Sequence, residues 1–88
     1  MKKSKTPEID NSLPLRPVVR ETMQMMPHRR WTEALLFAQI RAEYPDSAKA
    51  DVGAALDWNF RQGYVKREFN HQFEQYEWFL TAAGKDAD

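Results

Sequence analysis

Residues 47–84 decide the fold, and they read SAKADVGAALDWNFRQGYVKREFNHQFEQYEWFLTAAG. In the first part of this segment an apolar side chain recurs at every fourth position, at Val52, Leu56 and Phe60. That spacing places the three side chains on one face of a helix. Gly63 predicts the end of the helix, because glycine readily adopts the left-handed conformation that closes one.

Beyond Gly63 the pattern changes to that of two strands. Tyr64–Phe69 has a strand-like composition, and Tyr76–Leu80 shows the period-two alternation of a half-buried strand. The polar residues 70–72 between them favour a turn. The segment therefore predicts a helix followed by a two-stranded ribbon.

Two further helices are predicted upstream. Pro17 suits the first turn of a helix, where its missing N–H is not needed. Pro27 stops that helix near Met25. Its apolar stripe consists of Val19, Met23 and Met26.

The second helix begins after Thr32, a good N-cap, and runs to about Tyr44, before Pro45. Its expected buried line is Leu36, Ile40 and Tyr44. Asp46 or Ser47 is expected to cap the third helix. Trp31, in the linker before Thr32, is expected to form a one- or two-residue strand.

This order of elements resembles the winged helix-turn-helix superfamily. The run from Val52 through Leu56 to Gly63 and Arg67 is similar to the stretch where a recognition helix enters the first wing strand. The sequence WFLTAAGK at residues 78–85 resembles the closing L-T-x-x-G-[KR] of small bacterial regulators of the multiple-antibiotic-resistance and phenolic-acid-decarboxylase types. Asn59 departs from the pattern, which usually holds an apolar residue there, and we expect Phe60 to take over its packing.

The resemblance covers roughly residues 16–85. It implies an α+β winged helix, with a recognition helix at 47–62 that enters a major groove and a wing at 64–80 that touches phosphates or the minor groove. By the same resemblance, the first helix would be the site of any homodimer. The expected domain spans 15–85, between disordered segments at 1–14, which is basic, and at 86–88.

Composition excludes several classes of protein. The chain has 88 residues and no cysteine, which excludes disulfides and thiolate chemistry. Its longest apolar run, Ala34–Ala38, is too short for a membrane span. The two histidines have no acidic partners at ligand spacing, and no phosphate loop or nucleophile motif is present. We therefore expect a cytoplasmic protein of a bacterium or phage, with no catalytic residues, metal, cofactor, membrane contact or small-molecule substrate.

The zero net charge hides an asymmetry. Residues 1–30 carry seven basic and three acidic side chains, and the remainder carries six basic and ten acidic ones. A basic surface is what attracts DNA phosphates. We expect double-stranded DNA as the partner, with contacts from Arg29, Arg30, Thr32, Ser47, Lys49, Ala50, Ala54, Arg61, Lys66, Arg67, Asn70, His71 and Gln72.

A second hypothesis is a protein-interaction module on the same scaffold. Asp51 and Asp57 are expected on the recognition face, where they would repel phosphates. Exposed aromatic side chains would instead contact a protein partner, and the candidates are Trp58, Phe69 and Phe73. Trp58 could alternatively pack sideways on the second helix or the wing. A homodimer is compatible with both hypotheses.

Overall fold

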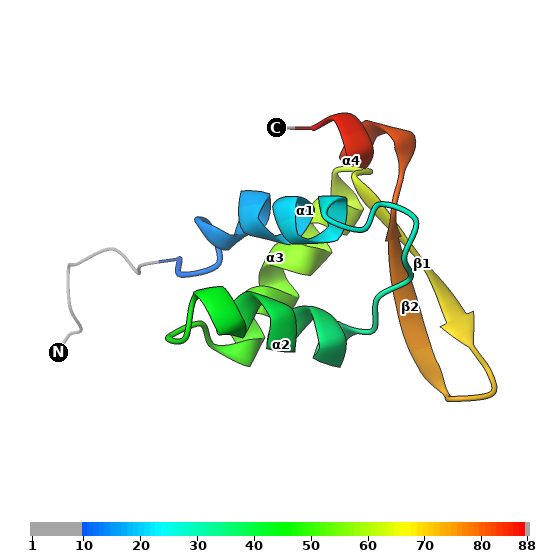
Figure 1. Cartoon of the computed structure of the whole chain (residues 1–88), viewed down its shortest axis with the longest axis horizontal. Coiled ribbons are helices and arrows are strands. Elements are labelled where there is room, and N and C mark those ends of the chain that lie inside the picture. The colour runs from blue at the N-terminus through cyan, green and yellow to red at the C-terminus, as the bar shows by residue number, and fades with distance from the viewer. Residues whose placement is uncertain (1–9, 88) are drawn as a thin grey trace, which may run out of the picture.

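A helical bundle and a two-stranded antiparallel sheet form the part of the chain that the computed structural model describes, residues 10–87 (Figure 1). In chain order the elements are α1 (Leu15–Gln24), α2 (Glu33–Glu43), α3 (Lys49–Arg61), β1 (Val65–Asn70), β2 (Gln75–Leu80) and α4 (Ala82–Asp86). This is the predicted α+β order. The predicted basic tail lies mostly at residues 1–9, outside the described residues, and residues 11–14 form a turn that leads into α1.

Helix α1 lies on α3 through an apolar stripe shifted toward its N-terminus. Leu15, Val19 and Met23 are buried. Met26, which was predicted to extend the stripe, is 52% exposed because the helix has already ended at Gln24. The predicted helix is therefore confirmed, whereas one member of its buried face was wrong.

Helix α2 begins as predicted. The Thr32 hydroxyl accepts a hydrogen bond from the Leu35 N–H at 3.1 Å, the geometry of an N-cap. Leu36 and Ile40 are buried, but Tyr44 is 44% exposed. Tyr44 follows the last helical residue and has left helical geometry, so its ring does not continue the buried line.

Helix α3 differs from the prediction at its start. Its N-cap is Ala48, which makes no side-chain hydrogen bond, so neither Asp46 nor Ser47 caps the helix. At its other end Gly63 has a φ of 82°, the left-handed geometry predicted for the turn into the sheet. The buried residues of α3 are Val52, Ala55, Leu56 and Asn59.

Asn59 is a polar residue with no exposed surface, and it ties α3 to α1. Its amide donates hydrogen bonds to the carbonyl oxygens of Arg16 (3.0 Å) and Ala55 (2.8 Å). Its amide oxygen accepts one from the Arg20 guanidinium at 3.0 Å. Phe60 does not replace Asn59 in the core as expected, because it is only partly buried, with its ring edge-on to Trp78.

The sheet pairs β1 with β2 in antiparallel register, with Val65 opposite Leu80 and Asn70 opposite Gln75. Trp31 forms an isolated bridge to Trp78, with hydrogen bonds of 2.8 and 2.7 Å. This bridge is the short third strand predicted near Trp31. The hairpin turn extends beyond the bundle on the side of α2 (Figure 1).

Helix α4 holds the junction between α3 and β1. The Thr81 hydroxyl accepts from the Gly84 N–H at 3.1 Å and donates toward the carbonyl oxygens of Gly63 (2.6 Å) and Tyr64 (3.1 Å). Gly84 lies so close to Tyr64 that an added Cβ would stand 1.9 Å from its carbonyl oxygen. The predicted T-x-x-G motif is thus a clamp on the hinge.

No helix within residues 10–87 combines the length and the apolar character that crossing a membrane requires.

Candidate nucleic-acid interface

The outward face of α3 is the first part of the candidate site. The side chains furthest from its buried stripe are Ala50, Ala54, Asp57 and Arg61, all exposed. The Arg61 guanidinium forms an ion pair with Asp57 one turn earlier, at 3.0 Å. The ion pair offsets the charge of Asp57, and the two alanine side chains project only a short way from the helix. Such a helix can approach base edges closely, and alanine suits contact with a thymine methyl group.

Gly53 and Lys49 lie on the flank of α3 that faces α2. An added Cβ at Gly53 would stand 3.1 Å from the Glu33 carboxylate. Glycine therefore permits the close approach of α3 to α2 at this position. The Lys49 ammonium is exposed and forms no ion pair within the described residues.

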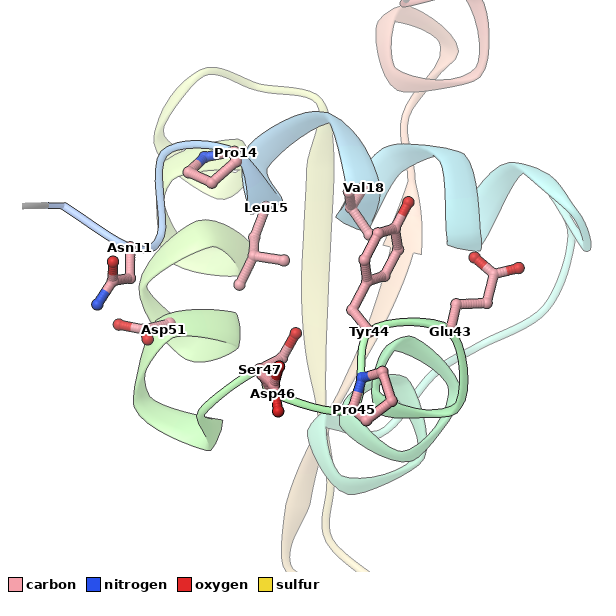
Figure 2. A pocket seen from close by; sticks show the side chains of 10 residues that line it. All are labelled: Asn11, Pro14, Leu15, Val18, Glu43, Tyr44, Pro45, Asp46, Ser47 and Asp51. Carbon is pink, nitrogen blue, oxygen red and sulfur yellow. The ribbon is translucent and has the colours of Figure 1, made fainter.

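Asp51 does not lie on the outward face, contrary to expectation. It lines a surface pocket between the start of α1 and the turn from α2 to α3, with Asn11 beside it and Leu15 in the centre (Figure 2). The pocket encloses about 560 Å³, and Glu43 and Asp46 contribute further carboxylates. It lies at the end of the bundle away from the hairpin. Asp51, one of the two carboxylates expected to repel DNA phosphates, therefore faces this pocket and not the outward side of α3.

Ser47 lines this same pocket. The structure thus separates Ser47 from the hairpin residues that were predicted to act with it.

Trp58 packs sideways, as one of the two alternatives expected, and its ring contacts are with α1 and with Tyr64, the first residue of the predicted wing. Its indole lies against α1, where the Arg16 guanidinium stacks 4.7 Å from the ring centroid, and the Tyr64 ring is 6.1 Å away. The side chain is half-buried. Cation–π contacts of this kind stabilise a partly exposed ring. Trp58 is therefore a packing residue on the α1 side, with part of its ring still accessible.

Arg67 occupies a slot between α3 and the hairpin. Its guanidinium lies 4.7 Å from the Phe60 ring, 4.4 Å from Tyr76 and 5.4 Å from Trp78. The side chain is still exposed, because the slot opens to solvent beside Glu33. Lys66 alternates to the opposite face of the sheet, where it is exposed without an ion pair in residues 10–87. The two cations predicted at the base of the wing, Lys66 and Arg67, therefore lie on opposite faces of the sheet.

The polar residues of the turn are divided between structure and surface. The Asn70 side chain accepts hydrogen bonds from the N–H groups of Gln72 (2.9 Å) and Phe73 (3.2 Å) and donates one to Glu77 (3.1 Å). Asn70 therefore shapes the turn. His71 and Gln72 have exposed side chains, and the His71 ring lies edge-on to Phe69.

The linker cations lie along the sheet. Arg30 forms an ion pair with Glu68 at 2.6 Å and stacks 4.6 Å from the Phe79 ring, which places it on the face of the sheet opposite Arg67. Arg29 stacks 5.2 Å from the Trp31 ring. Thr32 is engaged in the cap of α2. The linker is therefore close to the wing, and the Arg30 charge is partly offset by Glu68.

Three features of the site escaped sequence reasoning. Tyr76 is 43% exposed and stacks edge-on with Phe69 at 5.2 Å, and its alternation in β2 could have suggested this position. Glu33, in the first turn of α2, lies beside the Arg67 slot and close to Gly53, and no sequence pattern indicated either neighbour. Arg16 had no sequence signal, because its role depends on how α1 crosses α3.

A scan against models of known protein families found no match, and neither did a search of curated proteins. A search of solved structures found similarity to a chain described as the ferric uptake regulator from Francisella tularensis with iron. The TM-score is 0.67 and the sequence identity 14%. The match covers 93% of this chain, which spans only 59% of the other. This likeness agrees with the helix order and the hairpin, and it shows the winged-helix fold.

Proposed function

We propose that this winged-helix chain binds double-stranded DNA with α3 and its hairpin, as a small transcriptional regulator of a bacterium or phage that acts in the cytoplasm. The observation that supports this proposal best is the outward face of α3. This face is exposed, its side chains at Ala50 and Ala54 are short, and its net charge is zero because Arg61 forms an ion pair with Asp57. A face of this shape suits entry into a major groove.

Basic side chains at the start of α3, in the linker before α2 and on both faces of the wing would supply the affinity. Lys49 at the start of α3 and Lys66 on the wing have no acidic partner within residues 10–87. Arg29, Arg67 and His71 add further donors along the hairpin. Phosphate contacts of this kind release counterions and make binding depend on salt.

The second candidate, a protein-interaction module, is favoured by one observation. Phe69, Phe73 and Tyr76 are 42%, 63% and 43% exposed on a single hairpin. Aromatic side chains are enriched at protein interfaces. In this reading the hairpin would contact a protein or a second copy of the chain.

A salt titration separates the two candidates. The affinity for a mixed-sequence duplex is measured by fluorescence anisotropy at several salt concentrations, for the unaltered chain and for Lys49→Ala with Lys66→Ala. We expect the slope of log K against log salt to fall by about 1 for each phosphate contact removed. The matched control is Lys85→Ala, an exposed lysine in α4, away from the turn of the hairpin. Absence of duplex binding at low salt, or an equal effect of the control, would overturn the DNA-binding proposal.

A further inference from the structure

Phe73, at the turn of the wing, is the most exposed large apolar side chain in residues 10–87, at 63%. The other exposed aromatic rings of the hairpin have partners, because Phe69 and Tyr76 lie edge-on to each other. The Phe73 ring makes no such ring contact within the described part of the chain. The fold therefore leaves this ring unused.

The turn holds Phe73 in a defined position. The Phe73 N–H donates to the Asn70 side chain, and Glu74 adopts a φ of 53°, which reverses the chain just after the ring. Below the turn, an aromatic ladder of Phe69, Tyr76 and Trp78 stiffens the hairpin. A ring presented on a stiff turn loses little conformational freedom when it binds.

The surroundings of Phe73 are polar. Its near neighbours in the turn and at the start of β2 are His71, Gln72, Glu74 and Gln75, all exposed. Phe69 and Tyr76 are also exposed on the hairpin, but they pack edge-on against each other, whereas Phe73 stands at the turn without a ring partner in the described residues. One unpaired ring flanked by polar residues offers little area to a broad apolar protein surface. It matches the minor groove, whose floor offers acceptor atoms to amide and imidazole donors and whose base-pair steps accept apolar wedges.

We propose that Phe73 inserts between two base pairs from the minor-groove side, so that the chain kinks the DNA it binds. This inference rests on the proposed function and adds a mechanism of DNA deformation to it. Wedges of this type unstack one step and bend the duplex toward the major groove. Pyrimidine–purine steps are the easiest to open, so a TA step under the wing is the preferred site.

The experiment places 2-aminopurine next to a central TA step in a duplex that carries a donor and an acceptor dye at its ends. For the unaltered chain we expect brighter 2-aminopurine and closer ends on binding. For Phe73→Ala we expect both signals to be lost, with an affinity lower by about tenfold and an unchanged salt slope. Phe73→Leu, still an apolar wedge, should keep part of both signals. The matched control is Tyr44→Ala, an exposed aromatic residue in the pocket at the far end of the bundle.

The outcomes separate the wedge from the proposed function. Duplex binding by the unaltered chain without unstacking or bending overturns the wedge alone. Retention of both signals in Phe73→Ala also overturns the wedge. The wedge is likewise overturned if the unaltered chain self-associates in sedimentation and Phe73→Ala does not, because Phe73 then belongs to a protein interface. No duplex binding at any salt concentration overturns the proposed function together with the wedge.

Discussion

Replacement of Asn59 with leucine tests the buried contact between α1 and α3. The amide loses two hydrogen bonds to the carbonyl oxygens of Arg16 and Ala55, each of which contributes about 1 kcal/mol. The Arg20 guanidinium loses an acceptor, which costs about 1.5–3 kcal/mol for a charged donor. The leucine side chain returns about 1.5 kcal/mol through apolar burial. We therefore expect the free energy of unfolding to fall by about 2–3.5 kcal/mol.

Equilibrium urea unfolding measures this change through the fluorescence of the buried Trp31 and Trp78, which are 3% and 5% exposed. The matched control is Gln39→Leu, a comparable change at an exposed position of α2, which should stay within about 0.5 kcal/mol of the parent. If Asn59→Leu is as stable as the parent at an unchanged urea dependence, the hydrogen bonds of Asn59 do not stabilise the fold and the reasoning is refuted.

Three further predictions concern Gly84 in α4, Gly63 at the end of α3 and the turn before α1. Gly84→Ala should lower the free energy of unfolding by about 1–3 kcal/mol, because its Cβ would meet the Tyr64 carbonyl oxygen at 1.9 Å, and a thermal melt equal to the parent would contradict it. Gly63→Ala has open space around its Cβ, so only the left-handed backbone should cost it about 1–2 kcal/mol; a larger loss in the same melts would point to an unseen clash. The Ser12 hydroxyl and then its N–H hold the pKa of Asp10 below the ordinary 3.8, so their interaction persists above that pH and is lost as the pH falls through the lowered pKa. An NMR titration of the Ser12 amide with a midpoint above 3.8 would disprove this.

The turns and caps were predictable because each depends on a local conformational preference. Gly63 was identified as the end of α3 because the left-handed geometry favours glycine. Thr32 was identified as a cap because its hydroxyl reaches the N–H three residues on. The T-x-x-G motif was recognised by resemblance, and the contact of Gly84 with Tyr64 supplies its physical reason.

The direction of each helix face was less predictable. The prediction centred the buried stripe of α3 on Val52, Leu56 and Phe60, whereas the structure centres it nearer Ala55 and Asn59. That rotation is about 50° on a helix that turns 100° per residue. It moved Asp51 and Trp58 off the expected recognition face and toward α1. The family resemblance marked position 59 as usually apolar, but the residue type gave no sign that an asparagine would be buried there, because its partners Arg16 and Arg20 come from another helix.

The contacts of the basic side chains could not be predicted from the sequence either. Arg67 lies among three rings, and Arg30 meets Glu68 across a sequence separation of 38 residues. Both contacts depend on the register of the hairpin and on the Trp31 bridge. Residue types alone indicated basic side chains near DNA, but not which of them were already engaged.

The clamp at Thr81 and Gly84 has a consequence for engineering. Its hydrogen bonds and close contact hold the end of α3, the start of β1 and the end of β2 together at one point. A chimera that transplants the hairpin from another scaffold without its own closing turn would inherit a ribbon with the wrong tilt. A chimera should therefore transfer the whole stretch from α3 through α4. If only the recognition helix or only the hairpin is exchanged, we expect the two to be misaligned.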